Sequence, residues 1–283
     1  MSGSPSKTRG PLLDLARRQV ASRSARDLVT QWERDGTVMA SPVDQRTTVK
    51  LDGLALTSAL EYEALQLSPV APLGTNSVVA PTSQDRTLST TRATEVVSDP
   101  TNVLALEAAR RLARDPDAIV RLCTCHQTLR MQGVDSSSKR SQHFRLFALA
   151  DAGRGQPDDG FEVAAVVRQL AVFDRLFDQF ETEGFTLADR RAILRSAPDK
   201  SVLADRIEAA LVEQLRHVGV SREPLTSDYY GGLRVGFGAN DRSGQFQEIV
   251  DLGAFDWVAQ LANDARQRFI ASGLGIQLVP LLF

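Results

Sequence analysis

The stretch SDYYGGLRVGFGANDRSGQFQEIVDLG runs from Ser227 to Gly253 and joins two runs of β-favouring residues that are rich in glycine. The runs, Tyr229–Phe237 and Phe246–Asp251, predict two strands separated by a polar loop. Glycine within a strand often marks the close approach of another backbone or a ligand. These glycines predict no phosphate loop, because they have neither the G-x-x-x-x-G-K-[ST] spacing nor the strand-to-helix context of G-x-G-x-x-G.

Helices and strands are expected on both sides of this hairpin. Apolar residues at helical spacing predict a long helix over Phe161–Glu183 and another over Ser201–Val218. Strand-like runs at Ile119–Met131 and His143–Ala150 flank a polar loop. The other expected elements are helices over 11–34, 54–65, 102–114 and 256–272, an extended stretch over 38–51, and a buried strand over 275–283. Hairpins with interspersed helices indicate an α+β fold, with a mixed, mainly antiparallel sheet flanked by helices.

The composition excludes several classes of protein. The 283 residues carry 33 basic and 35 acidic side chains, and a net charge of -2 does not indicate a polyelectrolyte partner. No apolar run approaches the roughly 18 residues of a membrane-spanning helix, so no membrane role is expected. Two cysteines are too few for a disulfide scaffold and indicate a reducing compartment, so we expect a cytoplasmic location.

The sequence Cys123-Thr124-Cys125-His126 contains residue types that bind metals. In a strand, however, the two cysteines face one side and the histidine faces the other. A structural zinc site also needs four ligands, typically with a wider cysteine spacing. We therefore predict buried thiols in a core strand and no metal site.

Basic residues gather in and around the hairpin that joins the strands at 119–131 and 143–150. They are Arg130, Lys139, Arg140 and Arg145. The planar fork of an arginine donates paired hydrogen bonds to phosphate or carboxylate groups. The hairpin is therefore a candidate anion site, and a solvated basic tip is the alternative interpretation.

This hairpin resembles motif 2 of the class II aminoacyl-tRNA synthetases, and the chain is nearest to their histidyl type. Leu129-Arg130-Met131-Gln132 is similar to the F-R-x-E of that motif, whose arginine holds the α-phosphate of ATP. The resemblance implies nucleotide binding by Arg130, Gln132, Lys139 and Arg140, with ATP and Mg as the cofactors.

Two further segments carry the resemblance on the amino-acid side. Asp99 and Thr101, within EVVSDPT, match the acidic and threonine positions of the family's L-R-P-E-G-T segment, which contacts the amino acid. Asp228, Tyr229 and Tyr230 match the histidyl-specific L-D-Y-Y-T-G signature, the most specific of the motifs. The resemblance implies that these five residues bind an amino-acid-like ligand.

The departures from the family pattern bear on activity. Gln132 replaces the glutamate of motif 2, and Leu225 stands where the family has an arginine before its L-D-Y-Y segment. The arginine of motif 3 has no match, and Arg266 and Arg268, on the helix predicted over 256–272, are the only replacement candidates. Because each pre-placed cation stabilises a phosphoryl-transfer transition state by several kcal/mol, these losses argue against ordinary amino-acid activation.

The resemblance covers about residues 25–283. We therefore expect residues 1–24 to form a flexible tail and the start of an N-terminal helix, and residues 25–283 to form one synthetase-like core without an anticodon-binding domain. The resemblance also implies a homodimer.

Two functions remain open, and the sequence does not decide whether the chain is an enzyme. The first is a regulatory or partner subunit that binds an amino acid or a nucleotide and does not charge tRNA. It would be similar to the histidyl-synthetase-like subunit of ATP phosphoribosyltransferase, with a phosphoribosyltransferase as its protein partner. The second is an ATP-dependent ligase that adenylates a small amino or carboxylic acid and transfers it to an acceptor other than tRNA.

Overall fold

The computed structural model describes residues 5–133 and 141–283, and the chain forms two compact units. Unit 1 consists of Met1–Pro42, Ser68–Asp99 and Gln127–Phe144. Unit 2 consists of Val43–Leu67, Pro100–His126 and Arg145–Phe283. No helix among the described residues has the length and hydropathy needed to cross a membrane.

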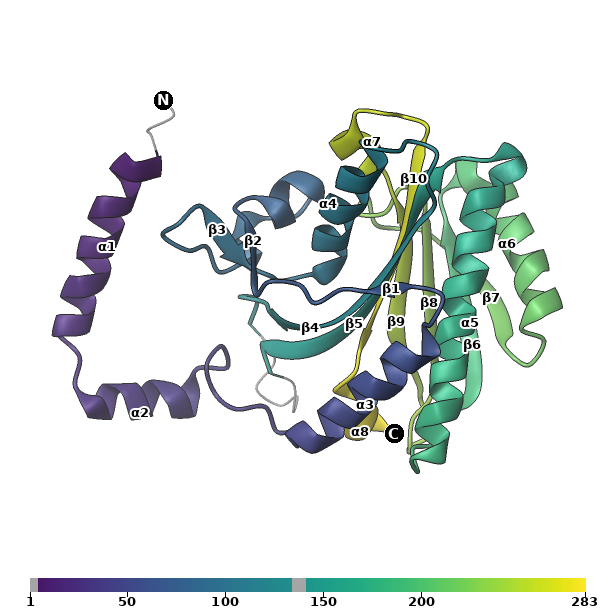
Figure 1. Ribbon diagram of the computed structural model, residues 1–283. Coiled ribbons are helices and arrows are strands. Elements are labelled where there is room, and N and C mark those ends of the chain that lie inside the picture. The colour runs from purple at the N-terminus through teal and green to yellow at the C-terminus, as the bar shows by residue number, and fades with distance from the viewer. Residues whose placement is uncertain (1–4, 134–140) are drawn as a thin grey trace. The chain divides into compact units, whose positions relative to one another are not determined.

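The main feature of unit 2 is an eight-stranded mixed sheet with the strand order β1-β4-β5-β10-β9-β8-β6-β7 (Figure 1). Its strands are β1 (Glu63–Ala64), β4 (Val120–Leu129), β5 (His143–Arg154), β6 (Ala188–Ser196), β7 (Gly219–Pro224), β8 (Leu233–Asn240), β9 (Phe246–Phe255) and β10 (Gln267–Gly275). The pairs β10–β5, β10–β9, β8–β9 and β6–β8 are antiparallel, whereas β1–β4 and β6–β7 are parallel. The predicted α+β class with a mainly antiparallel sheet is therefore confirmed.

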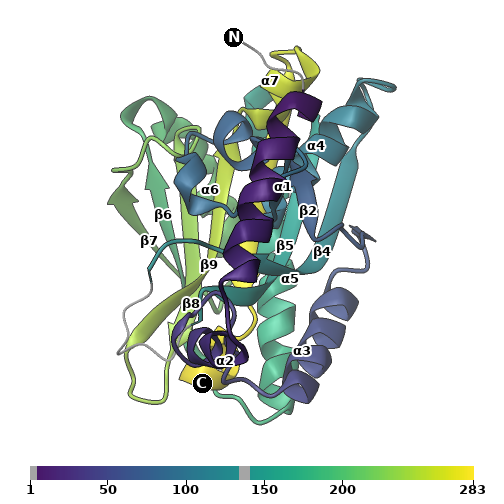
Figure 2. The same ribbon diagram turned by 90° about the vertical axis from the view of Figure 1, so that its left-hand side faces the viewer.

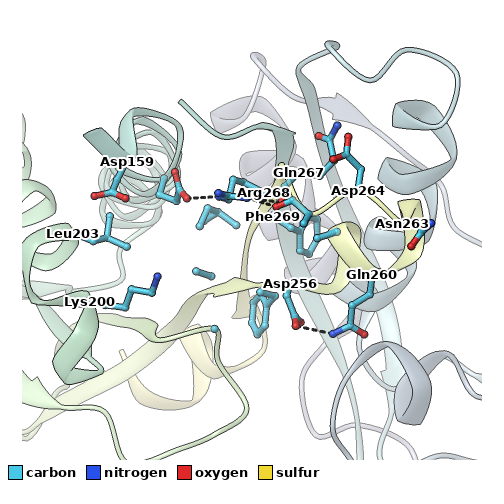
Figure 3. Close-up of a pocket in the computed structure, with 17 residues that line it drawn as sticks. Asp159, Lys200, Leu203, Asp256, Gln260, Asn263, Asp264, Gln267, Arg268 and Phe269 are labelled. Carbon is cyan, nitrogen blue, oxygen red and sulfur yellow. Dashed lines mark hydrogen bonds and ion pairs between the residues drawn. The ribbon is translucent and has the colours of Figure 1, made fainter. Parts of the chain in front are cut away.

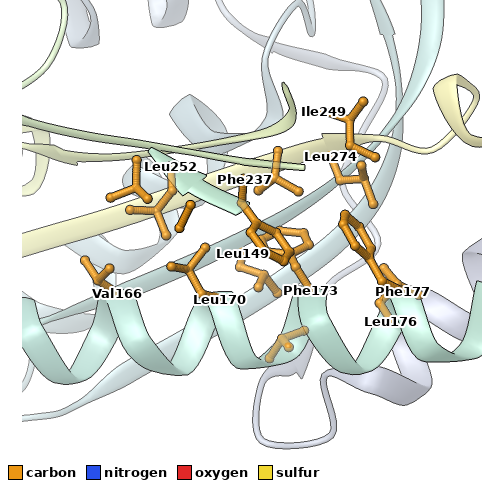
Figure 4. Close-up of a cluster of buried hydrophobic side chains, with 14 of the residues drawn as sticks. Leu149, Val166, Leu170, Phe173, Leu176, Phe177, Phe237, Ile249, Leu252 and Leu274 are labelled. Atoms are coloured by element: carbon orange, nitrogen blue, oxygen red, sulfur yellow. The ribbon is translucent and has the colours of Figure 1, made fainter. Parts of the chain in front are cut away.

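Helix α5 (Gly160–Thr182) covers one face of this sheet and buries most of its apolar side. Along β8, Leu233, Val235 and Phe237 alternate with polar residues and glycines, so a single face of the strand enters the core. The ring of Phe177 on α5 stacks on that of Phe237 with centroids 5.0 Å apart, and Figure 4 shows this contact among leucines from β5, β9 and β10. These residues form the centre of the hydrophobic core.

Further helices of unit 2 pack around α5 and the sheet. Figure 2 shows α3 (Gln45–Ser58) beside α5, and α6 (Ser201–Gln214) also packs on α5. Helix α4 (Pro100–Leu112) packs against α7 (Trp257–Ala262), and the short α8 (Leu278–Leu282) follows β10.

Unit 1 contains the helices α1 (Pro5–Ala21) and α2 (Ala25–Arg34) and a small antiparallel sheet of β2 (Val70–Pro72) and β3 (Thr94–Val96). The short helical turns η1 (Thr75–Val79) and η2 (Gln84–Arg86) lie between these two strands in the chain. The ends of β4 and β5 also belong to this unit and carry the predicted basic hairpin.

Five predicted elements differ from the structure. The helix expected over 11–34 is interrupted between α1 and α2, and the helix expected over 54–65 ends at Ser58, before β1. The helix expected over 256–272 ends at Ala262, because Asn263 adopts a left-handed conformation (φ 51°) and the chain turns into β10. The strand expected over 275–283 is instead the helix α8. Helix α3 occupies much of the stretch expected to be extended, because the carboxylate of Asp44 accepts the backbone N–H of Arg46 and caps a helix that begins at Gln45.

Candidate functional site

The face of the unit 2 sheet opposite α5 carries a group of charged and aromatic side chains that we call the sheet-face cluster. Its members are Arg195 on β6, Tyr230, Arg234 on β8, and Glu248 and Asp251 on β9. The antiparallel register sets Arg195 opposite Arg234, and Arg234 opposite Gly253. Residues from three strands therefore meet on one surface.

Ion pairs connect the cluster from strand to strand. Arg234 donates from Nη2 to Oε1 of Glu248 over 2.6 Å and from Nε to Oδ1 of Asp251 over 2.8 Å. Arg195 contacts the other oxygen of Glu248 at 2.9 Å and donates to Glu223 on β7 over 2.8 Å. Two guanidinium groups thus face three carboxylates, and the cluster with Glu223 has no surplus of positive charge.

Tyr230 completes the cluster from the turn that precedes β8. Its hydroxyl donates to Oδ2 of Asp251 over 2.6 Å, and the guanidinium of Arg234 lies 5.5 Å from the centre of its ring. Burial and the neighbouring charge of Asp251 raise the pKa of the Tyr230 phenol above its ordinary value. Burial is the largest single effect on the pKa of Arg234 and lowers it, but the hydrogen bond to Asp251 together with the charges of Asp251 and Glu248 outweighs burial, and the pKa is raised. Both groups therefore keep their protons at neutral pH.

Glycines make the room that the cluster occupies. A Cβ atom on Gly253 would lie 2.4 Å from Cδ1 of Tyr230, and one on Gly236 would lie 2.1 Å from the carboxyl carbon of Glu248. The glycines in this hairpin thus permit close approach, but at these two positions a side chain of the same unit approaches, and not the backbone or ligand that the sequence predicted.

An aromatic group adjoins the cluster and includes the predicted ligand residue Tyr229. Its ring meets those of Tyr230, Phe255 and Trp257 edge-on, with centroids 5.0, 5.5 and 5.9 Å apart. Asp228, which the resemblance places beside the tyrosines, is exposed in the turn. Among the residues that match the signature, Tyr230 therefore contacts a charged group of the cluster through its hydroxyl, and Tyr229 contacts the adjoining aromatic rings.

Unit 1 holds Arg130, the residue expected to bind a nucleotide phosphate. Its Nε donates to the carbonyl of Ser98 over 3.1 Å, and its Nη2 lies 3.6 Å from Oδ2 of Asp99. The guanidinium also lies 5.1 Å from the ring centre of Phe144. The structure thus brings together Arg130 and Asp99, which were predicted to bind different parts of the ligand.

The loop that carries Ser98 and Asp99 is held by a buried polar network. The carboxylate of Glu95, only 2% exposed, accepts the backbone N–H groups of Gly74 and Asn76 over 2.8 and 2.7 Å. The hydroxyl of Ser98 donates to the side chain of Asn76 over 3.0 Å. Arg130 therefore contacts a fixed loop.

The other predicted residues are placed as follows. Gln132 is exposed, and its backbone carbonyl accepts a hydrogen bond from Gln142 over 3.0 Å. Thr101 is buried in the first turn of α4 in unit 2. Lys139 and Arg140 lie outside the described residues.

The remaining arginines named from the sequence pair with carboxylates of unit 2. Arg145 donates to Asp52 on α3 over 2.7 Å, and Arg266 donates to Asp264 over 2.9 Å. Arg268 donates to Glu162 over 2.9 Å and lies in β10, and Arg266 lies in the turn before that strand, so the prediction that both belong to a helix is wrong. Each of these cations is therefore neutralised within its own unit.

A cavity of about 640 Å³ lies elsewhere in unit 2, between the first turns of α5 and α6 and the segment that joins β9 to β10 (Figure 3). Lys200, Asp256 and Arg268 contribute charges of both signs to its wall, and Phe255 and Phe269 contribute apolar surface. Its volume suits a small molecule. Phe255 connects this cavity to the aromatic group that contains Tyr229.

The cysteines lie on β4 and have no disulfide. Burial raises the pKa of the Cys123 thiol to about 11, so it stays protonated at neutral pH. In the part of the chain that the structure describes, no three His, Cys, Asp or Glu side chains are grouped as metal ligands.

The architecture of unit 2 and its hairpins is the class II aminoacyl-tRNA synthetase-like fold. A histidyl-tRNA synthetase from S. aureus is similar in structure, with a TM-score of 0.64 and 12% identity over 87% of this chain and 68% of that protein. No family model matches the sequence, and no curated protein sequence does.

Two further solved structures have the same fold. One is an ATP phosphoribosyltransferase regulatory subunit/histidyl-tRNA synthetase from Bacillus halodurans, with a TM-score of 0.61 and 12% identity over 85% of this chain and 80% of that one. The other is a histidine–tRNA ligase subunit from Alicyclobacillus acidocaldarius, with a TM-score of 0.61 and 13% identity over 87% and 95% of the two chains. At these identities the likeness establishes the fold.

Most of the sheet-face cluster, including Arg195, Arg234 and Glu248, was not predicted from the sequence. A signal for Arg234 was present, because it alternates with Leu233 and Val235 and so had to face away from the core. Arg195 belongs to β6, a strand that was not predicted and whose pairing with β8 follows only from the sheet order, whereas Glu248 lies on the second strand of the predicted hairpin.

Proposed function

We propose that this chain is a paralogue of the histidyl-tRNA synthetases that binds an amino-acid-like molecule at the sheet-face cluster and acts as a regulatory or partner subunit. It does not charge tRNA in this proposal. The fold supports the relationship, and the Bacillus halodurans neighbour has a regulatory subunit in its name.

The charge balance of the cluster carries the proposal. Arg195 and Arg234 are both engaged by carboxylates, with contacts of 2.6–2.9 Å to Glu248, Asp251 and Glu223. A nucleotide triphosphate brings several negative charges and needs cations that are not already neutralised. The cluster therefore does not fit a triphosphate.

An amino acid carries one positive and one negative group, and the cluster offers partners for both. Its carboxylates can accept the ammonium group, and Arg234 can share its donors with the ligand's carboxylate. Exchanging one ion pair for another leaves the net charge of the surface unchanged, so no isolated charge is left partly buried.

Arg130 supports the second function, an ATP-dependent ligase. Its guanidinium is held by the Ser98 carbonyl, the Asp99 carboxylate and the Phe144 ring, and a phosphate could replace Asp99 as the partner of its planar fork. The ligase would need Mg with its ATP, and the acceptor would be a molecule other than tRNA.

Calorimetric titration of the full chain with each of the twenty amino acids, with and without Mg-ATP, tests the two functions. We expect an amino acid to bind without ATP, and ATP–pyrophosphate exchange to be absent with every amino acid. Arg234→Gln should weaken amino-acid binding by about tenfold or more, because a charge-assisted hydrogen bond contributes about 1.5–3 kcal/mol.

Arg222→Gln is the matched control. Arg222 also pairs with two carboxylates of unit 2, Asp205 and Glu208, each at 2.6 Å, but it lies outside the cluster. Exchange activity that Arg130→Ala removes would replace the regulatory proposal with the ligase. Equal losses in Arg234→Gln and Arg222→Gln would remove the site assignment.

The partner is tested separately. We propose a phosphoribosyltransferase as the partner, by analogy with the Bacillus halodurans neighbour. Co-purification of such an enzyme with the tagged full chain, and a change in its activity on adding the amino acid, would support a regulatory role. Independent migration of the two proteins would contradict it.

A further inference from the structure

The cavity of about 640 Å³ in unit 2 has two buried acceptor oxygens in its wall that the described part of the chain leaves without a donor (Figure 3). Glu162 accepts from Nε of Arg268 on its Oε1 over 2.9 Å, but its Oε2 has no hydrogen-bond partner among the described residues. Gln267 donates to the carbonyl of Pro116 over 2.8 Å, and its buried Oε1 likewise has no partner there. Since a buried acceptor without a donor is costly, both oxygens favour a ligand that brings O–H or N–H groups.

Lys200, the residue that precedes α6, provides donors in the same cavity. It forms no ion pair among the residues that the structure describes, and Figure 3 shows its side chain directed into the cavity. Its stem packs on Gly232, where a Cβ atom would lie 2.8 Å from Cγ of the lysine. Gly155 makes room for Arg268 in the same way, because its Cβ would lie 3.0 Å from Cζ of that arginine. Glycines therefore allow both cations of the wall to take these positions.

The charges of the wall are balanced. Three of its carboxylates are paired with arginines, and the remaining charged residues, Lys200 and Asp256, carry one charge of each sign. A charged ligand would bury its charge in this cavity without an equal surplus of the opposite sign, so a neutral ligand fits better. The paired residues, at 2.6–2.9 Å, are Asp159–Arg206, Glu162–Arg268 and Asp264–Arg266.

We propose that this cavity binds an uncharged sugar ring. Sugar hydroxyls donate and accept, so they can donate to Glu162 and Gln267 and accept from Lys200. The C–H groups of the ring can pack on Leu203 and Phe255, which also line the cavity. Two sources present this chemistry, namely a free mono- or disaccharide and the ribose of a nucleoside.

This inference goes beyond the proposed function and does not depend on it. Arg268 pairs with Glu162 of α5, and its alternate neighbour Ile270 belongs to the core that α5 covers. The Glu162–Arg268 pair therefore lies on the α5 side of the sheet, whereas the sheet-face cluster lies on the opposite face.

Saturation-transfer NMR and calorimetric titration of the full chain test the inference in two arms. One arm uses ribose, glucose, galactose, maltose and trehalose, and the other uses adenosine, guanosine, cytidine and uridine. We expect binding in at least one arm, and the arm that binds identifies the source of the ring. Lys200→Ala should raise the dissociation constant by about tenfold and leave the melting temperature unchanged, because Lys200 has no ion pair among the described residues to lose. Glu162→Gln should also weaken binding, because an amide has only one acceptor oxygen and Arg268 already engages one.

Lys50→Ala is the matched control, because Lys50 is an exposed lysine of unit 2 that pairs with Glu183 and does not line this cavity. It should leave sugar binding unchanged. Arg234→Gln should also leave sugar binding unchanged, and Lys200→Ala should leave amino-acid binding unchanged. The failure of this inference is therefore distinguishable from the failure of the proposed function.

Three results would overturn the inference. The first is the absence of binding in both arms at millimolar ligand concentrations. The second is binding that Lys200→Ala and Glu162→Gln both leave at the wild-type affinity. The third is binding of ribose 5-phosphate while ribose and the nucleosides do not bind, since Lys200 would then belong to an anion site.

Discussion

The substitution Gly253→Ala should change the geometry of the sheet-face cluster and leave the stability of the fold almost unchanged. A Cβ atom at this position would lie 2.4 Å from Cδ1 and 2.9 Å from Cε1 of Tyr230. Ordinary contacts begin at 3.4 Å, so the ring must retreat by about 1 Å. That movement breaks the 2.6 Å hydrogen bond from Tyr230 to Asp251.

The effect on stability is small because two terms oppose each other. A hydrogen bond to a charged group contributes about 1.5–3 kcal/mol, and the value here is nearer ~1 kcal/mol because the side chain of Asp251 is 51% exposed. Replacing a strand glycine with alanine gains about 0.5–1 kcal/mol, mainly from the unfolded chain. We therefore expect the melting temperature to change by only about 4 °C or less.

The effect on binding is larger, because the displaced Tyr230 ring and the freed Asp251 belong to the proposed ligand surface. Calorimetry with the amino acid that binds the wild type should show a loss of affinity of about tenfold or more. Gly53→Ala in α3 is the matched control, because its Cβ would meet nothing within 4 Å. It should stabilise the chain slightly and leave binding unchanged. Wild-type affinity in Gly253→Ala would refute the assignment of the ligand to this surface.

Three further predictions concern the fold. Gly238→Ala should destabilise the chain by about 3 kcal/mol in urea unfolding, because its Cβ would lie 1.9 Å from a backbone oxygen of β9 that cannot move aside; a change below about 1 kcal/mol would contradict this register. Phe177→Ala should lose about 3–5 kcal/mol, because its fully buried ring stacks on Phe237 at 5.0 Å, and a much smaller loss would contradict the packing. Burial, with the charge of Arg145 as the second cause, lowers the pKa of His126. Unfolding then takes up a proton below about pH 6.5, so stability should fall as the pH drops, by at most about 1.4 kcal/mol per pH unit. The same urea titrations on His126→Gln should lack this component, and an unchanged pH dependence would contradict a buried neutral imidazole.

Helices and strands were predictable from the sequence where one pattern of apolar residues, helical or alternating, runs through the whole element. The apolar stripe of α5 and the alternation of β8 predict both elements within a few residues. The stretch from Asp256 to Ser272 was mistaken for one helix, because its ending depends on the left-handed conformation of Asn263. The start of α3 was not predicted because Thr47 and Thr48 favour strands, and this preference opposed the helix-capping signal of Asp44.

The candidate site was less predictable because its contacts are long-range. Arg195 and Arg234 face each other only because β6 and β8 are antiparallel neighbours in a particular register. Glu223 reaches Arg195 because β7 runs parallel to β6, a pairing that nothing near either strand indicates. Motif resemblance located Tyr230, but the carboxylate that it contacts lies 21 residues away, on the next strand.

The same contacts predict that the stability of the cluster depends more on its balance of charges than on any one of its residues. Arg234 connects Glu248 to Asp251, and Asp251 in turn accepts the hydroxyl of Tyr230. Removing Arg234 leaves Asp251 without its arginine, and Arg195 alone facing Glu248 and Glu223. Changing Arg234 to glutamine and Glu248 to methionine together removes one charge of each sign. If charge balance is what holds the cluster, the double variant should be more stable than Arg234→Gln alone. A double variant that is no more stable than Arg234→Gln in urea unfolding would contradict this explanation, and Glu248→Met alone completes the double-mutant cycle.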